Sequence, residues 1–456
     1  MRTMFRVLPP LSGACHCPRS QTAERVRLVH PAEEFQSIGE LCMDTFDFDT
    51  PIRRSQSLSV KWNRGAIASI CNNADATPHW VADMDFPAPP AVLDAIHAQA
   101  EHGVLGYPAF STIASTFATW SEQRHNWHVD PSMVVAVPGM LASIATLVEL
   151  YSQPGDGIVV PMPAYKPFVD IVRRLGRTLV EWPMQYHPDN ARFTLATDSL
   201  ETLLSRPNTP ILLFCSPHNP TGRVFGEQEL HAIAEIAARC AAMVISDEIH
   251  ADLSFPTSNH IPFDTVARQY GIACATCMAP SKTFNIAGEH FSIVVCSDTA
   301  VRSRLQHRLR ALHIAPDLLA TVTALAAYGQ GYEWLVHLNR HLVSQARLIG
   351  ELLEHSGTGL QFVAPEASFI GLIDCTEILT KVEADSARNP ELYRVATSPE
   401  GGLLSRFFGQ RAGIAMNDGS WFGEHYGNFV RFNYGTTKAA VVQAIEAMVA
   451  AVNRLS

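Results

Sequence analysis

Short apolar runs alternate with helix-length segments through the middle of the chain. Between the apolar runs, residues 227–240 place apolar positions at helical spacing, and residues 301–312 form an Arg-rich helical pattern with leucines on one side. Five runs have the length and composition of buried strands: 157–161, 210–215, 243–246, 272–278 and 292–296. This alternation predicts an α/β fold in which helices cover both faces of a mostly parallel sheet.

A second, smaller lobe is indicated after residue 330. Gly329-Gln330-Gly331 interrupts the alternation, and residues 334–355 follow as a long amphipathic helix with one apolar stripe. Because such a stripe must be covered, we expect it to pack on a separate domain. The expected division is a disordered extension (1–43), a segment that joins the small domain (44–90), a large domain (91–329) and a small C-terminal domain (330–456). The polar stretch 383–402 is predicted to be a surface insertion.

Composition excludes several classes of protein. The formal net charge is -10, from 34 basic and 44 acidic residues, with no dense basic block, so nucleic acid is not expected as a partner. The most apolar stretch, 133–151, is broken by Pro138, Gly139 and Glu149, so no membrane span is predicted. At the N-terminus, Pro9 and Pro10 cut short any signal-like apolar core.

The ten cysteines are scattered and mostly lie inside apolar runs, where a reduced cysteine behaves as a small hydrophobe. This distribution favours a reducing cytoplasm. Cys274 and Cys277 have the spacing of a redox motif or half of a zinc site, but no second pair follows at ligand spacing. We therefore expect structural cysteines and no metal.

Three chemically distinctive residues each follow a strand-like run. Asn219 lies in Ser216-Pro217-His218-Asn219-Pro220-Thr221-Gly222, Asp247 comes 28 residues later, and Lys282 follows Asp247 by 35. Open α/β sheets bind ligands where strands end. An amine, a carboxylate and a turn-held amide are the groups that the ring of pyridoxal 5'-phosphate (PLP) needs, so this spacing predicts a PLP enzyme.

Lys282 is the expected catalytic residue. It would carry the cofactor covalently and, once displaced by substrate, act as the base at Cα, because burial and a cationic ring both lower a lysine's pKa. Ser281 before it is suited to bond the cofactor phosphate. Asp247 would keep the ring nitrogen protonated through a charge-assisted hydrogen bond. The competing interpretations are a surface charge for Lys282 and a helix-capping or surface acid for Asp247.

Further candidates are weaker when taken singly. Asn219, extended before Pro220, would bond the phenolic oxygen of PLP, although Asn-Pro is also an ordinary loop signal. Gly139-Met140-Leu141 opens a helix after the strand-like run 134–137 and would present backbone N–H groups to a phosphate, as any helix start does. Tyr165 would stack on the ring or simply pack. Arg431, a lone cation between apolar residues, would clamp the substrate α-carboxylate or form an internal salt bridge.

With these residues assembled, the chain resembles the fold-type I PLP enzymes of the class I/II aminotransferase superfamily, within it the MalY/PatB-type cystathionine β-lyase (C–S lyase) subgroup. The likeness covers nearly everything from about residue 44 onward. The resembling segments are 46–49, 60–62, 80–86, 102–107, 246–250, 279–288, 365–368 and 419–423.

The resemblance implies a large domain with a mostly parallel seven-stranded sheet, a smaller α+β domain, and a homodimer with shared active sites. In such a dimer Tyr107 would reach the partner's PLP phosphate and substrate, while Ala82 and Asp83 would line the substrate entrance. His250 stands where aminotransferases often carry Tyr and would contact the cofactor. His290 stands where relatives commonly carry Lys or Arg near the phosphate, and Glu289 beside it is also unusual.

The family's usual start matches near residue 44, so we also hypothesise that Met43 is the true initiator. The expected reaction is β-elimination from L-cystathionine or a related L-cysteine S-conjugate, which gives a thiol, pyruvate and ammonia. Two alternatives stay open at this point. One is a class I/II aminotransferase, and the other is a regulatory binding protein that holds PLP as a structural ligand.

Overall fold

The computed structural model describes residues 46–394 and 401–455. The chain divides into two compact units, Met1–Met43 and Asp44–Ser456. The expected extension and the hypothesised start at Met43 lie outside the described residues, and the following description concerns the second unit alone. The division of this unit into large and small domains stays a prediction.

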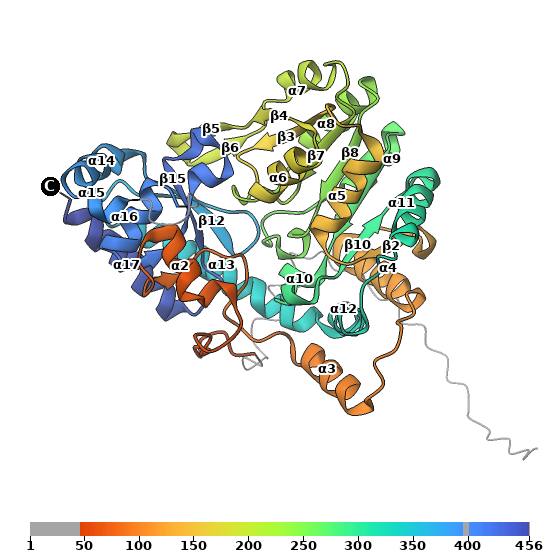
Figure 1. Cartoon of the computed structure of the whole chain (residues 1–456), viewed down its shortest axis with the longest axis horizontal. Coiled ribbons are helices and arrows are strands. Elements are labelled where there is room, and N and C mark those ends of the chain that lie inside the picture. Colours follow the sequence, from red (N-terminus) through yellow and green to blue (C-terminus); the bar gives the residue numbers. More distant parts are fainter. Residues whose placement is uncertain (1–45, 395–400, 456) are drawn as a thin grey trace, which may run out of the picture. The chain divides into compact units, whose positions relative to one another are not determined.

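A seven-stranded sheet forms the centre of the fold (Figure 1). Its order is β2-β10-β9-β8-β7-β3-β4, and only β10 runs antiparallel to its neighbours. The strands are β2 (Val134–Val137), β3 (Gly157–Met162), β4 (Thr178–Pro183), β7 (Ile211–Cys215), β8 (Met243–Asp247), β9 (Cys274–Met278) and β10 (Ser292–Val295). The expected mostly parallel sheet is confirmed.

Helices cover both faces of this sheet because its strands are apolar on both sides. In β3, Ile158 and Val160 face a core that includes side chains of α5, α6 and α11, whereas Val159 faces a core with α7, α8 and α9. The helices of this part are α3 (Pro90–His102), α4 (Ser111–His125), α5 (Met140–Tyr151), α6 (Lys166–Arg174), α7 (Thr197–Leu204), α8 (Glu227–Arg239), α9 (Phe263–Tyr270), α10 (Pro280–Thr283), α11 (Thr299–Ala311) and α12 (Leu318–Gln330). A short hairpin, β5 (Gln185–His187) with β6 (Arg192–Thr194), follows β4.

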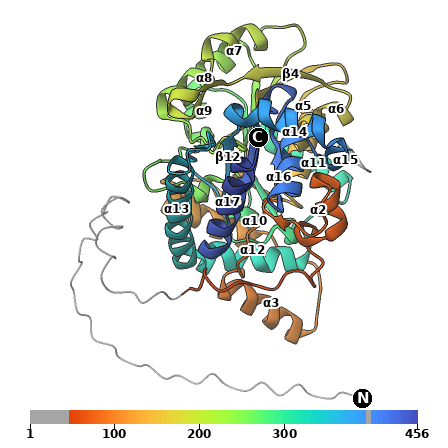
Figure 2. The ribbon, with the colours of Figure 1, turned by 90° about the vertical axis from the view of Figure 1, so that its left-hand side faces the viewer.

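A second, antiparallel sheet has the order β11-β12-β15-β14. Its strands are β11 (Gln361–Val363), β12 (Ile370–Asp374), β14 (Asn417–Asp418) and β15 (Phe429–Asn433), and the helices of this region are α13 (Tyr332–Glu354), α14 (Leu379–Arg388), α15 (Pro390–Tyr393), α16 (Leu403–Arg411) and α17 (Lys438–Asn453). Figure 2 shows α13, α16 and α17 beside β12. The amphipathic helix predicted over 334–355 is therefore present as α13.

The polar stretch 383–402 is helical over most of its described residues. Residues 383–388 complete α14 and residues 390–393 form α15, and most side chains from 383 to 394 are exposed or half-buried, as a surface segment requires, while Asp385 and Tyr393 are buried. That the stretch is an insertion stays a prediction. Asp385 can be buried because its carboxylate has partners: it pairs with Arg411 at 2.8 Å and accepts a hydrogen bond from the Tyr393 hydroxyl at 2.5 Å. Residues 395–400 lie outside the described part.

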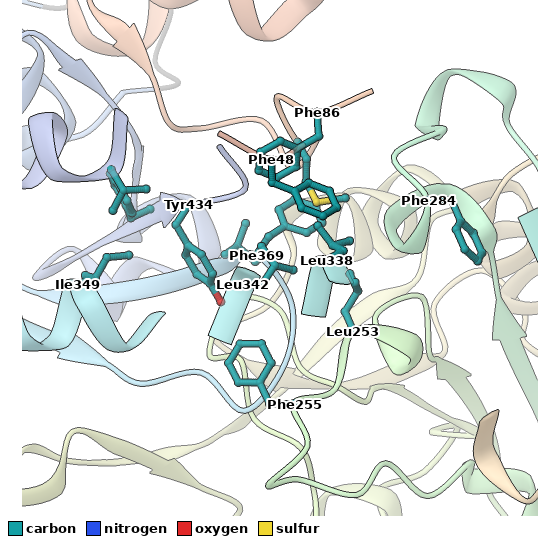
Figure 3. Close-up of a cluster of buried hydrophobic side chains, with 14 of the residues drawn as sticks. Phe48, Phe86, Leu253, Phe255, Phe284, Leu338, Leu342, Ile349, Phe369 and Tyr434 are labelled. Carbon is teal, nitrogen blue, oxygen red and sulfur yellow. The ribbon is translucent and has the colours of Figure 1, made fainter. Parts of the chain in front are cut away.

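The segment before α3 packs against the second sheet and α13. It contains α2 (Arg64–Cys71) and β1 (Thr77–Pro78), which pairs in parallel with β13 (Ile414–Ala415). Figure 3 shows Phe48 and Phe86 beside Leu338 and Leu342 of α13, and the two phenylalanine rings are 5.0 Å apart. These aromatic contacts fix both ends of residues 48–86 on the core. Among the described helices, none is long and apolar enough to cross a membrane.

Candidate active site

The ends of three neighbouring parallel strands bring the predicted residues together. Asp247 is the last residue of β8, and in the sheet register it stands between Cys215 of β7 and Cys277 of β9. Asn219 follows the end of β7. Lys282 lies in α10, which begins directly after β9 because Pro280 occupies the first helical position. The strand order therefore gathers residues that are 28 and 35 positions apart in the sequence.

Lys282 lies deep in this site, with a side chain that remains partly accessible. Its Nζ donates a hydrogen bond to the Ala82 carbonyl at 2.5 Å. Burial lowers the pKa of Lys282 to about 8, and Arg431 acts in the same direction while Asp83 and Asp247 oppose it. A substantial fraction of the amine is consequently neutral near physiological pH, as a nucleophile or base requires.

Asp247 is a buried carboxylate, 3% exposed. Its Oδ1 accepts a hydrogen bond from the Ile249 amide at 3.0 Å, and no Lys, Arg or His of the described residues forms an ion pair with it. Burial raises the pKa of Asp247 to about 7, against the lowering effect of the Ile249 N–H. The surface and helix-cap interpretations are excluded, because Asp247 ends an interior strand.

Arg431, in β15, is 2% exposed and is held by neutral acceptors. It donates to Asn219 Oδ1 at 3.2 Å, to the Trp80 carbonyl at 2.7 Å and to Asn417 Oδ1 at 2.7 Å, and it lies over the Phe422 ring. Its Nε has no partner. Burial lowers the pKa of Arg431 to about 10. Within the described part of the chain no carboxylate pairs with this arginine, so the salt-bridge alternative is excluded there.

Asn219 is positioned by a turn that needs glycine. Gly222 donates to the His218 carbonyl at 2.7 Å, has φ +69°, and leaves no room for a Cβ against Pro365. This geometry holds the Asn219 side chain 6% exposed, with its oxygen on Arg431. The turn predicted from Thr221-Gly222 is therefore present.

Two ring-bearing residues complete this side of the site. Tyr165 precedes α6, packs edge-on against Phe168 and has its pKa raised by burial, with Arg431 and Asp247 both close enough to influence it. His250 hydrogen-bonds Ser368 Oγ through Nδ1 at 3.0 Å. Burial, helped by Lys282 and Arg431, lowers the pKa of His250 to about 3, so the imidazole is neutral.

The phosphate-binding candidates lie at the starts of α5 and α10 and at His290, beside Gly139. Gly139, with φ +94°, precedes Met140, and the His290 ring lies next to the Gly139 Cα. Met140 is buried and Leu141 is 37% exposed, while Ser281 is the second residue of α10. The free N–H groups of a helix N-terminus suit an anion.

Tyr107 stands apart from these residues. It is fully exposed, in the segment between α3 and α4, together with Val104 and Leu105. The structure of the single chain therefore does not bring Tyr107 to the site, and its expected role in a partner's site stays a prediction.

Several site residues carried no role in the sequence interpretation. Asn433 donates to the Val81 and Asp83 carbonyls, and Asn417 receives Arg431. The signal for Asn433 was available, because a residue two positions after Arg431 on a strand shares its face. Behind Lys282, the hydroxyl of Thr283 donates to the buried Asp252 at 3.0 Å. No pattern in the sequence pairs Thr283 with Asp252.

Comparisons with known proteins agree with this geometry. Cystathionine β-lyase PatB of Bacillus subtilis is 33% identical over 331 residues, which cover 72% of this chain and 84% of the relative. Protein MalY of Escherichia coli is 26% identical over 411 residues, 89% of this chain and 99% of the relative. The structure of the PLP-bound C–S lyase from Staphylococcus hominis superimposes with a TM-score of 0.80 at 25% identity, covering 90% of this chain and 98% of the lyase.

The family resemblance drawn from the sequence is thereby confirmed, and with it the fold-type I architecture. The sequence model of the aminotransferase class I and II family matches residues 81–448, from the segment that contacts Lys282 to the last helix. The chain belongs to the aminotransferase class I and II family.

Proposed function

We propose that this chain is a PLP-dependent C–S β-lyase that cleaves L-cystathionine or related L-cysteine S-conjugates to a thiol, pyruvate and ammonia. The observation that carries the proposal is the convergence of a lysine with a lowered pKa, an unpaired buried carboxylate and an arginine without a carboxylate. The relatives named cystathionine β-lyase and C–S lyase support it.

The residues present fit PLP. Asp247 is a buried carboxylate with a raised pKa, and a protonated ring nitrogen is the cation that would return it to the ionised form. Asn219 and Tyr165 would hold the ring, and His250 would contact it as a neutral group. Ser281, His290 and the N–H groups at Met140 and Leu141 would bind the phosphate.

When bound, PLP supplies an electron sink for the carbanion at the substrate Cα. Arg431 would bind the substrate α-carboxylate with two hydrogen bonds, exchanging the neutral Trp80 carbonyl for a charged acceptor. Lys282, whose lowered pKa leaves a substantial fraction of the amine neutral, would take the Cα proton. The sulfur then leaves Cβ with its electron pair and takes up a proton, and one water converts the remaining fragment to pyruvate and ammonia.

The substrate side chain would enter past Ala82 and Asp83. Asp83 is the more accessible of the acids near Lys282, with its side chain 22% exposed, and Arg54 pairs with it at 2.8 Å. A polar rim of this kind suits an amino-acid thioether whose distal end is itself charged.

We further propose that the protein acts as a homodimer. The exposed apolar side chains Val104 (65%), Leu105 (67%) and Tyr107 (fully exposed) form a surface that a second copy would bury. In that dimer Tyr107 would approach the partner's cofactor phosphate and substrate, and Tyr107→Phe should weaken PLP binding without changing the mass of the assembly. The cytoplasmic location and the lack of a nucleic-acid partner stay predictions from the sequence.

The test is an assay of the purified protein with PLP, L-cystathionine and a panel of L-cysteine thioethers. Release of thiol and pyruvate in equal amounts is expected. Failure to release either product from any thioether would overturn the proposal. If turnover instead requires a 2-oxo acid and yields a new amino acid, the protein is an aminotransferase. A partner-binding function that survives Lys282→Ala would favour the regulatory alternative.

A further inference from the structure

Two of the segments singled out in the sequence, 60–62 and 80–86, meet in one charged cluster together with Arg54. We call Arg54, Lys61, Asp83 and Asp85 the entrance cluster. Lys61 Nζ donates to Asp85 Oδ2 at 2.9 Å and to the Asp83 carbonyl at 3.0 Å. Arg54 pairs with Asp83 at 2.8 Å and with Asp85 at 2.6 Å. The cluster thus balances two cations with two anions.

The burial of Lys61 needs an explanation. Its side chain is only 1% exposed, and lysine is almost never buried unless it is paired. Both of its hydrogen-bond partners lie in residues 83–85. The Trp62 indole also donates to Asp85 Oδ1, at 3.1 Å, and the Trp80 indole donates back to the Lys61 carbonyl at 3.0 Å. Lys61 and Trp62 are therefore bonded to the segment 80–85 in both directions.

This segment is also bonded to the proposed catalytic residues. Each carbonyl from Trp80 to Met84 accepts a hydrogen bond from a side chain, and the donors in order are Arg431, Asn433, Lys282, Lys61 with Asn433, and Arg54 with Asn285. Arg431 and Lys282 thus take their positions from the same five residues that Lys61 holds. A shift of this segment would move both donors together.

Electrostatics also link the entrance cluster to Lys282. Although burial acts to raise the pKa of Asp85, Lys61 and Arg54 hold this pKa below its usual value. Asp83 acts to raise the pKa of Lys282. Loss of the Lys61 charge would leave Asp83 less compensated and would make the surroundings of Lys282 more negative.

We propose that Lys61 is a positioning residue for the active site: by bonding Asp85 and the Asp83 carbonyl, it holds residues 80–85 where they orient Lys282 and Arg431. This inference rests on the proposed function of those two residues. A plain structural anchor would stabilise the fold without affecting the chemistry at Lys282.

The test compares the full-length, PLP-loaded protein with Lys61→Met, which keeps the length of the side chain and removes its charge. Arg411→Met is the matched control, because it removes a cation that pairs with Asp385 at 2.8 Å, away from the entrance cluster. Hydrogen exchange would follow the Met84 amide, bonded to Asn285 Oδ1 at 2.9 Å, and the Asp85 amide, bonded to the Gly435 carbonyl at 2.7 Å. In Lys61→Met we expect these amides to exchange roughly tenfold faster while other core amides do not change.

Two further readouts separate positioning from stability. The pH midpoint of the visible absorbance of the cofactor on Lys282 should rise by roughly half a unit in Lys61→Met, since a cation has been removed. The KM for a thioether should rise about tenfold with a smaller change in kcat, because Arg431 loses its alignment for the carboxylate. Arg411→Met should leave all three quantities at their wild-type values.

Unchanged exchange at Met84 and Asp85 together with an unchanged midpoint would overturn the inference. If Lys61→Met does not fold, Lys61→Gln provides the same readouts with a polar side chain in place. Neither exchange nor the absorbance midpoint depends on which substrate is cleaved. A wild-type protein that releases no thiol therefore refutes the proposed function alone, whereas normal exchange and midpoint in an active Lys61→Met refute this inference alone.

Discussion

Two buried carboxylates in the site, Asp247 and Asp85, have opposite surroundings. Asp247 ends a strand of the large sheet and has no cationic partner within ion-pair distance among the described residues, so burial raises its pKa to about 7. Asp85 meets Lys61, Arg54 and the Trp62 indole, and these offset its burial. Removing one partner of a buried ion pair is destabilising, whereas a buried acid without a cationic partner is itself costly unless a ligand binds it. The contrast supports the proposed role of Asp247 as the acid that binds the cofactor.

The largest expected effect comes from removing the amine of Lys282. Lys282→Ala should lower thioether cleavage about a thousandfold or more, because the nucleophile and general base are both lost. Thiol release and the visible absorbance of the loaded protein measure it. Lys381→Ala, on the exposed surface of α14, is the control and should match the wild type. Retained cleavage in Lys282→Ala would remove the basis of the proposed mechanism.

The next largest effect tests Asp247, the buried carboxylate without a cationic partner. Asp247→Asn should lower kcat by about tenfold to a hundredfold, the equivalent of one charge-assisted hydrogen bond, because the amide cannot keep a ring nitrogen protonated. The same change should leave the cofactor-free protein at least as stable as the wild type, since it removes a buried charge without a partner. Steady-state kinetics and urea unfolding check the two statements. An active but unstable variant would reverse the assignment of Asp247.

Asp85, the buried carboxylate that is paired with cations, should show the opposite effect on stability. Asp85→Asn leaves Lys61 buried with a weakened partner and should lower the free energy of unfolding by about 3 kcal/mol. Urea unfolding of the cofactor-free protein measures the loss. Asp75→Asn, whose ion pair with Arg64 is exposed on both sides, should change stability by less than about 1 kcal/mol. Equal stabilities for the two variants would show that the entrance cluster contributes no more than a surface pair.

The effect that is smallest per step of measurement is a pH dependence. The pKa of Asp247 is about 7 in the folded chain, whereas an unperturbed aspartate, as in the unfolded chain, has a pKa of 3.8. Between these two pH values the folded state keeps a proton that the unfolded state has lost. Its contribution to stability therefore falls as pH rises through this window, by at most about 1.4 kcal/mol per pH unit. The difference in unfolding free energy between wild type and Asp247→Asn, measured without cofactor from pH 4.5 to 7, isolates this slope. A difference that is flat with pH would contradict the raised pKa.

The site residues that follow the ends of strands could be predicted from the sequence. Lys282, Asp247 and Asn219 each come after an apolar run, and the parallel order of β7, β8 and β9 is enough to bring them together. Arg431 was found as a lone cation in an apolar strand. Sequence spacing could not choose between a salt bridge and a free guanidinium, because that depends on which side chains face β15.

The entrance cluster could not be predicted from the sequence in the same way. Arg54 reaches Asp83 across 29 positions and Lys61 reaches Asp85 across 24. Asp83 and Asp85 lie between β1 and α3, outside any helix or strand, so no periodic pattern sets which side chains they meet. The burial of Asp385 within the polar residues 383–393 could not be predicted for a related reason. Its partners are Arg411 and Tyr393, and composition does not show which side chains pair.

The neutral partners of Arg431 have a consequence for which molecules are accepted. Trp80 and Asn417 already offer this guanidinium two amide-type oxygens at 2.7 Å. A free amino acid improves on them, because its carboxylate brings a full charge into a dry site. A peptide-linked or amidated cysteine derivative would only replace one uncharged oxygen with another and would gain little. If Arg431 binds the substrate carboxylate as proposed, this exchange of acceptors would favour free amino acids over peptides, independently of the size of the pocket.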